Sequence, residues 1–399
     1  MSIAVTAVDF RPATKATYAA FIWAGVAMSS WATRIPQIRD ALHLTPSQLG
    51  LVLLAIAAGS ITSLVASGHM VARFGSRRTV ATMAAVLAVA LTGAASGYHL
   101  GVVPVVLSLY AFGFANGAWD VAMNVQGAVV EQGLGRSIMP RFHAGFSIGT
   151  VAGALIGAAM VAAHVPVTLH LTVTAVAVGL GTIYAVRRFV PDVAAEEQTP
   201  ESGTGLGHTL RFWREPRTLL VGVFVLAFAF AEGTGIDWIG VAVIDGYDAP
   251  AAVGTLAFAL FLAAMTTGRW FGPWLLDRYG RVPVVRALAV ISLAGLLLFV
   301  FGPSTPVAFG GALLWGLGAS LGFPVGMSAA SDDPALAAPR VSVVASIGYC
   351  AFLGGPPLIG FLGDHVTVVR ALAAVAVLLG VALLVAGAIR PLQPAPTTD

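Results

Sequence analysis

The sequence has few charged residues and almost no cysteine. Only 10% of its 399 residues are Asp, Glu, Lys or Arg, against about 25% in an average soluble domain. The single cysteine, Cys350, excludes a disulfide framework and a cysteine-rich metal site. The net charge of +3 is spread over several loops, which argues against nucleic-acid binding. Most of the chain is therefore suited to lipid or to a water-free core.

The sequence also lacks the common motifs of ATP-driven and metal-dependent proteins. It contains no G-x-x-x-x-G-K-[ST] phosphate loop, no H-E-x-x-H motif and no Cys/His metal set. We therefore expect no enzymatic activity, no cofactor and no built-in ATP motor. Energy for any transport step must come from an ion or solute gradient.

Long apolar stretches are what the sequence has in abundance. Stretches of roughly 18–25 apolar residues can cross a bilayer as helices, and about twelve are present, separated by charged or Pro/Gly-rich breaks. They centre near residues 26, 60, 88, 112, 154, 176, 230, 260, 292, 314, 352 and 378. The sequence therefore predicts an all-α membrane protein with twelve transmembrane helices and no cleaved signal peptide.

Basic residues favour alternate connections between these spans. They gather at 73–78, 136–141, 187–188, 211–217, 278–281, 340 and 390, whereas the other connections hold mainly Arg34, Arg39 and Arg370. Since cytoplasmic loops carry the excess of Lys and Arg, we expect both termini in the cytoplasm. The polar run PDVAAEEQTPESGTGLG predicts a cytoplasmic linker at 190–216 between six-helix bundles at 1–189 and 217–399.

Three internal matches indicate that the two halves arose by duplication. RFGSRRTV at 73–80 matches RYGRVPVV at 278–285, and PRFHAGFSIG at 140–149 matches PRVSVVASIG at 339–348. FGFANGAWDVAM in the fourth span aligns with WGLGASLGFPVG in the tenth. All three offsets are close to half the chain, and three matches in one order argue for a repeat. In this alignment Asp120 corresponds to Phe323, so the acid exists in one half only.

The chain resembles the major facilitator superfamily. The resemblance rests on the basic turns after spans two and eight, the central linker and the repeat of two halves with six spans each. LLDRYGR at 275–281 is similar to that superfamily's Gly-x-x-x-Asp-Arg-x-Gly-Arg signature, although the first copy has Ala72 in place of the acid. The resemblance implies the superfamily fold, and a gating role for Asp277, Arg278 and Arg281.

Within the superfamily, WDVAMNVQG, MPRFHAGFSIGT and GGPPLIGFLGD are similar to YbjJ-type transporters, distant relatives of the fucose:proton symporters. That branch has an acid followed four residues later by Asn in the fourth span, as do Asp120 and Asn124. It also has an acid before an Ile-Pro at the end of the first span, where this chain has Arg34 instead. The resemblance therefore does not extend to sugar specificity.

Asn116, Asp120 and Asn124 are spaced four residues apart in the fourth span, which places them on one face of a helix. An Asp inside a bilayer costs roughly 2.5–3.5 kcal/mol. One explanation is a hydrogen-bonded clasp between helices. The other is a proton-carrying Asp120 flanked by Asn116 and Asn124 as substrate ligands, because ionisable residues in spans usually face a pathway.

The seventh span holds a second pair of acids, in FAFAEGTGIDWIG at 228–240. Glu232 is expected near the midplane and is a candidate for proton coupling. Asp237 is a candidate gating residue, or it approaches the outer headgroups. Gly233 and Gly235 allow a break in this helix, as in the discontinuous helices of transporters.

Arg34 lies toward the outer end of the first span. It either snorkels to the interface or faces a cavity, where it could bind an anionic substrate or close an outer gate with Asp237. Ser30 and Trp31 precede it and could contact a ligand. Trp119, Trp238 and Trp315 fall inside their spans and either line the cavity or pack between helices. His143 is either a proton relay or an interfacial, hydrogen-bonded histidine.

Together these features predict a secondary transporter that moves a small polar or amphipathic solute by alternating access. We expect it to be coupled to protons and to function as a monomer. Uptake of a sugar-like compound and proton-driven export of a drug or metabolite both fit. A membrane enzyme would need a nucleophile–base or metal cluster. A non-transporting receptor would be expected to carry a sizeable soluble domain, whereas the longest polar segment here is a linker.

Overall fold

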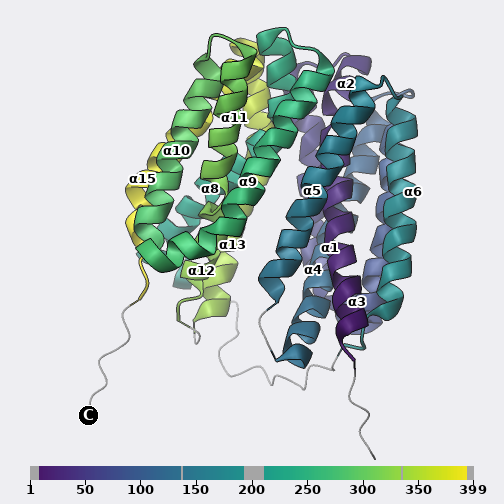
Figure 1. Cartoon of the computed structure of the whole chain (residues 1–399), viewed down its shortest axis with the longest axis vertical. Helices are drawn as coiled ribbons and strands as arrows, with labels where there is room; N and C mark the ends of the chain where they lie inside the picture. The colour runs from purple at the N-terminus through teal and green to yellow at the C-terminus, as the bar shows by residue number, and fades with distance from the viewer. Residues whose placement is uncertain (1–8, 136–137, 193–210, 334–335, 393–399) are drawn as a thin grey trace, which may run out of the picture. The chain divides into compact units, whose positions relative to one another are not determined.

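The computed structural model describes residues 9–135, 138–192, 211–333 and 336–392, and its regular elements in this range are helices (Figure 1). The chain forms two compact units. The first contains the described residues of Met1–Trp31, Ala55–Met160 and His164–Glu197. The second contains those of Ala32–Leu54, Val161–Ala163 and Gln198–Asp399. Most of the predicted linker, residues 193–210, lies outside the described residues, as do both chain ends.

The helices of the first half of the chain are α1 (Arg11–Ala32), α2 (Ile35–Ala41), α3 (Pro46–Gly97), α4 (Val102–Leu134), α5 (Met139–Ala162), α6 (Val167–Ala185) and η1 (Val186–Arg188). Those of the second half are α8 (Pro216–Tyr247), α9 (Ala251–Tyr279), α10 (Arg281–Phe301), α11 (Thr305–Ala319), α12 (Gly322–Ala330), α13 (Ala337–His365), α14 (Val368–Ala371), α15 (Ala374–Val385) and η2 (Ala386–Ile389).

Each of the twelve predicted span centres falls within one of these helices. Among the described residues, ten helices are long and apolar enough to cross a membrane. One of them, α3, has 52 residues and would be about 78 Å long at 1.5 Å per residue, enough for two crossings of a hydrocarbon layer about 30 Å thick. With α3 divided in two and the 22 residues of α1 added, the described helices account for twelve passes.

The internal repeat is visible in the backbone at two glycines. Gly75 divides α3 with φ 78° and ψ 160°, and Gly280 separates α9 from α10 with φ 79° and ψ 164°. Both follow a matching Arg-aromatic pair, Arg73-Phe74 and Arg278-Tyr279. A residue with a Cβ would be strained at this φ, so glycine allows the same sharp turn in both halves of the sequence.

Glycines let α5 approach α1 closely in the first unit. A Cβ added to Gly149 would lie 2.1 Å from the carbonyl oxygen of Ile22, and one added to Gly153 would lie 2.3 Å from Ser29 Oγ. The four-residue spacing of these glycines puts them on one helix face, as expected of a small-residue packing surface. The backbones therefore touch where larger side chains would hold the helices apart.

The second unit is built around α8, which packs against α9, α13 and α15, while α10 packs against α11 (Figure 1). Aromatic side chains fill the space between α9, α10 and α11. Trp315 is fully buried and meets Phe261 and Phe299 edge-on, with ring centroids 5.4 and 5.9 Å apart. Such edge-to-face pairs add to the stabilisation from burial, and they hold α9 firmly beside α11.

Candidate functional site

The clearest polar feature inside the spans is an ion pair between α8 and α9. Glu232, near the middle of α8, accepts hydrogen bonds from Nη2 of Arg269 at 2.7 and 2.8 Å, one to each carboxylate oxygen. Both side chains are partly exposed, Arg269 by 30% and Glu232 by 18%. Ionised residues within spans are costly and usually mark a pathway. This pair is therefore the centre of the candidate site in the second unit.

Arg269 is held from the other side by the end of α11. Its Nε donates to the backbone carbonyl of Ser320 at 3.2 Å. The preceding residue, Gly268, lies against the same turn, because a Cβ there would be 2.3 Å from Ser320 Oγ. The close backbone contact thus fixes the position from which the arginine side chain extends toward Glu232.

The helix that carries Glu232 is continuous. Gly233 and Gly235 allow a break, but α8 runs without interruption from Pro216 to Tyr247, so the helix is not broken there. Gly235 instead serves packing, since a Cβ there would lie 2.4 Å from the ring of Phe261. The close approach of α9 explains this glycine without any unwinding.

Asp237 lies further along α8 and borders a small cavity. The volume of the cavity is about 10 Å³, which is room for roughly one water molecule. Asp237 lines it together with Thr33, Ile35 and Pro36, the residues on either side of Arg34. Arg34 itself is buried, at 2% exposure, where α2 begins. The two predicted gating segments therefore meet at this cavity, while an Arg34–Asp237 gate stays a prediction.

The stripe on α4 forms a smaller polar site in the first unit. Asn124 donates from Nδ2 to the backbone carbonyl of Asp120 at 2.8 Å and to its Oδ1 at 3.3 Å. Asp120 is exposed, and Asn116 and Asn124 are half-buried. Within the described part of the chain, no cationic side chain forms an ion pair with Asp120. Its carboxylate is accessible and supported by an amide alone.

The predicted aromatic ligands are buried. Trp119, Trp238 and Trp315 have no exposed surface, and Trp31 and Ser30 are 4% and 1% exposed. For the three tryptophans inside their spans, this burial corresponds to the packing alternative that the sequence left open. In this conformation, contact with a solute would require their surroundings to move, so substrate binding by these residues stays a prediction.

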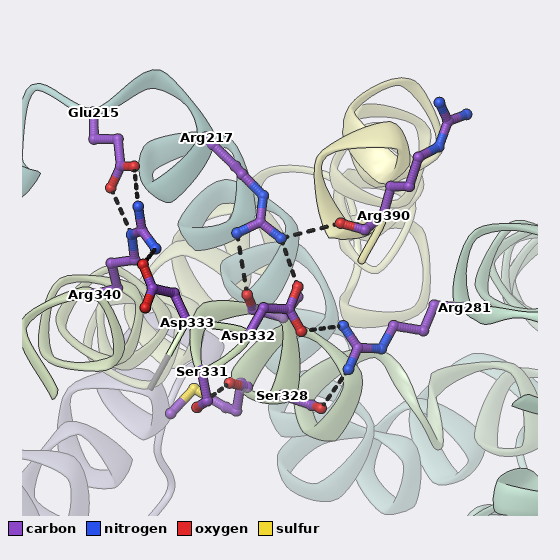
Figure 2. A network of polar contacts seen from close by, with 11 residues as sticks. Glu215, Arg217, Arg281, Ser328, Ser331, Asp332, Asp333, Arg340 and Arg390 are labelled. Atoms are coloured by element: carbon purple, nitrogen blue, oxygen red, sulfur yellow. Dashed lines mark hydrogen bonds and ion pairs between the residues drawn. The ribbon is translucent and has the colours of Figure 1, made fainter. Parts of the chain in front are cut away.

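A network of ion pairs joins the ends of α8, α10, α12 and α13 in the second unit (Figure 2). Asp332 accepts from Arg217 at 2.8 Å and from Arg281 at 2.6 Å. Arg340 donates to both oxygens of Glu215 at 2.7 and 2.9 Å, and the hydrogen bond from Arg340 holds the pKa of Glu215 below its usual value. Of the predicted gating residues, Arg281 belongs to this network.

The other two predicted gating residues lie outside the network. Asp277 and Arg278 are both exposed. The guanidinium of Arg278 lies 5.6 and 5.4 Å from the ring centroids of Trp274 and Tyr279, which is cation–π distance.

The matching turn in the first unit finds its acid elsewhere in the chain. Ala72 stands where the superfamily signature has an acid, but Asp192 reaches the same turn from beyond η1. Its carboxylate accepts hydrogen bonds from the backbone N–H and the hydroxyl of Ser76, each at 2.5 Å. The acid at this turn is thus Asp192, which is 116 residues from Ser76 in the sequence. The spacing of a local motif cannot reveal such a contact.

His143 lies near the start of α5, in edge-on contact with Phe21. In the same helix, GFSIG at 145–149 has the G-x-S-x-G spacing of a hydrolase nucleophile elbow. A nucleophile elbow needs a sharp strand-to-helix turn that exposes the serine. Ser147 is instead 5% exposed inside the uninterrupted helix α5, so the spacing occurs here without the required structure.

Sequence reasoning missed Arg269 and the partners in the network of Figure 2. A signal for Arg269 was present, because TTGRWFG interrupts an otherwise apolar span with one charge, and a charge in a span is a functional candidate by default. No comparable signal existed for Asp332, which lies beyond the end of a helix.

Comparison with known proteins agrees with this architecture. The profile of the Major Facilitator Superfamily matches residues 17–350. An uncharacterized transporter, y4wD, of Sinorhizobium fredii is 30% identical over 356 residues, which cover 88% of this chain and 90% of the relative. The crystal structure of a mutant of the nucleoside transporter NupG has a TM-score of 0.78 at 15% identity, with 95% of this chain and 99% of that one covered. The fucose:proton symporter FucP of E. coli has a TM-score of 0.65 at 16% identity, with coverage of 97% and 100%. This chain belongs to the major facilitator superfamily of membrane transporters.

Proposed function

We propose that this protein is a proton-coupled secondary transporter of a small polar or amphipathic solute in the bacterial inner membrane. It works as a monomer, and its halves, 1–189 and 217–399, alternate access to the two sides of the membrane. Both termini and the 190–216 linker are on the cytoplasmic side, where the basic connections would lie.

The observation that carries the proposal is the accessible carboxylate of Asp120. Without a cation partner among the described residues, an ionised carboxylate within a span is costly. A proton can neutralise it, and the hydrogen bonds from Asn124 hold the group in place. In this proposal Asp120 carries the coupled proton, and Asn116 and Asn124 offer amides to the solute. Glu232, ionised against Arg269, is the second coupling group.

Reconstitution into proteoliposomes with an internal pH-sensitive dye tests this function. A panel of uridine, fucose, xylose and amphipathic drugs is added outside, because solved structures with a similar fold include a nucleoside transporter, a fucose:proton symporter and a D-xylose-proton symporter. We expect at least one solute to change the internal pH only when the protein is present. Acidification indicates symport and uptake, and alkalinisation indicates antiport and export. The absence of any solute-dependent proton flux would count against proton coupling.

We further propose that Arg34 and Asp237 close an outer gate. Arg34→Gln and Asp237→Asn should each favour the outward-open state, because each removes one of the two charges whose attraction would close the gate. The double variant should be less impaired than the sum of the single variants. Labelling of one cysteine placed on the outer side, in a Cys350→Ser background, measures the shift. Purely additive effects, or unchanged labelling, would mean that the two residues do not form a gate and that Arg34 extends to the membrane interface instead.

A further inference from the structure

Arg269 has donor capacity that its protein partners do not use. A guanidinium offers five N–H groups. In this structure Nη2 serves both oxygens of Glu232 and Nε serves Ser320. Across the described residues, no hydrogen bond reaches Nη1. Nη1 of this partly exposed arginine, inside a membrane span, can therefore donate hydrogen bonds to a bound ligand.

The two contacts of Arg269 differ in how easily they can be exchanged. The Ser320 carbonyl belongs to the backbone and cannot leave, since α9 and α11 touch at Gly268. The carboxylate of Glu232 is on a flexible side chain and can lose its charge by taking up a proton. When it does, the charge-assisted hydrogen bonds to Nη2 weaken, and Nη1 and Nη2 together present the paired donors that a carboxylate accepts.

The other charged groups on α2, α8, α9 and α13 either pair elsewhere or lie at other places along these helices. Arg39 of α2 pairs with Asp245 near one end of α8, and Arg340 of α13 pairs with Glu215 at the other. At 1.5 Å per residue these acids are about 20 and 25 Å from Glu232 along the helix. On α9, Asp277 and Arg278 lie at its C-terminal end, and Asp237 of α8 lies beside the small cavity. Arg269 is the cation that faces Glu232.

We infer that Arg269 is the anchor for a carboxylate on the transported solute, which exchanges with Glu232 when Glu232 takes up a proton. The inference rests on the proposed transport function and specifies its substrate class as organic monocarboxylates. The charges balance, because the ion pair is neutral before the exchange. One proton and one monoanion enter together and leave the site neutral again, which avoids an uncompensated charge in the span.

The inference can be tested on the whole purified protein by thermal unfolding in detergent. The probes are two matched pairs, benzoate with benzamide and acetate with acetamide, at pH 5.5 and 7.5. We expect the carboxylates to raise the melting temperature and the amides to have no effect, with tighter binding at pH 5.5. Ionisation of the probe alone would act in the opposite direction, because less of each acid is ionised at pH 5.5.

Variants connect the effect to the two residues. Arg269→Gln should weaken carboxylate binding about tenfold or more, the loss expected for hydrogen bonds to a charged group. Glu232→Gln should abolish the tighter binding at pH 5.5, because the amide cannot take up a proton, and leave only the weak opposite effect of probe ionisation. The matched control is Arg214→Gln, which removes one positive charge from an exposed position outside the spans. It should bind benzoate like the parent.

Equal stabilisation by acids and amides, or unchanged carboxylate binding in Arg269→Gln, would overturn the inference. The proteoliposome assay distinguishes this failure from failure of the proposed function. If uridine or a sugar drives proton flux in both the parent and Arg269→Gln, the protein is a proton-coupled transporter and the carboxylate anchor is wrong. If no solute, benzoate included, drives flux but carboxylates bind through Arg269, the carboxylate site stands, whereas the proton-coupled function and the proton-linked exchange with Glu232 fail.

Discussion

Arg39 of α2 donates hydrogen bonds to both carboxylate oxygens of Asp245 near the end of α8, with Nη2 2.9 Å from Oδ1. The two residues are 206 positions apart. Residues 32–54 lie in sequence between stretches of the first unit, yet they cluster with the second. This ion pair is therefore one of the contacts that fasten α2 to α8. The side chain of Arg39 is 10% exposed and also pairs with the neighbouring, exposed Asp40, so loss of Asp245 leaves a largely buried guanidinium with this local partner alone.

We expect Arg39→Gln and Asp245→Asn each to lower the melting temperature, because each removes the ion pair between α2 and α8 and leaves Arg39 or Asp245 without its partner on the other helix. The double variant should be less destabilised than the sum, with a coupling energy of about 0.5–3 kcal/mol. Asp248→Asn is the control, since Asp248 is exposed with φ 49° and asparagine tolerates that conformation. Additive single effects would mean that the pair contributes nothing as a pair.

Asp120→Asn should abolish proton-coupled accumulation of solute and leave the protein folded. Asparagine has nearly the same shape and lacks the charge that makes Asp120 costly in a span. Exchange of solute without net proton movement should persist, since binding does not require titration. Uptake into proteoliposomes, with and without a pH gradient, measures both activities. If the variant concentrates solute as well as the parent does, Asp120 is a structural clasp.

The ion pair between Glu215 and Arg340 should stabilise the protein at neutral pH and not in acid. The pKa of Glu215 is lowered in the folded state, mainly by the hydrogen bond from Arg340. The contribution is thus fully present above the unfolded pKa of about 4.3. It is lost as the pH falls through the lower, folded pKa, because the unfolded state binds more protons there.

The melting temperatures of the parent and Glu215→Gln, measured between pH 7 and pH 3, test this dependence. The difference should be largest near pH 7 and shrink below about pH 4. Glu197→Gln removes an acid outside the described residues, and it serves as the control for the general effect of acid. A difference that stays constant over this range would contradict the assigned role of the ion pair.

Gly149→Ala should destabilise the first unit. The added methyl group would lie 2.1 Å from the carbonyl oxygen of Ile22, and backbone on both sides prevents a small local adjustment. The matched control is Gly310→Ala in α11, where nothing lies within 4 Å of the added Cβ. Alanine there should be neutral or gain up to about 1 kcal/mol in helix propensity. A Gly149→Ala variant as stable as the parent would show that α1 and α5 can separate freely.

The sequence determined the helices, their repeat and part of one site. In a bilayer the backbone must satisfy its own hydrogen bonds, so a long apolar run can only be a helix. For this reason all twelve predicted centres fall in helices. The bond from Asn124 to Asp120 follows from their four-residue spacing, because both residues lie on the same helix.

Tertiary structure alone decided which charges meet. Glu232 and Arg269 are 37 residues apart, Arg217 and Asp332 are 115 apart, and Arg39 and Asp245 are 206 apart. Periodicity shows which face of a helix a residue occupies, but it does not show which helix faces it. That choice depends on how closely backbones can approach, as where Gly268 lets α9 touch the end of α11 and directs Arg269 to Glu232. The candidate site therefore arises from packing between helices, which sequence spacing does not encode.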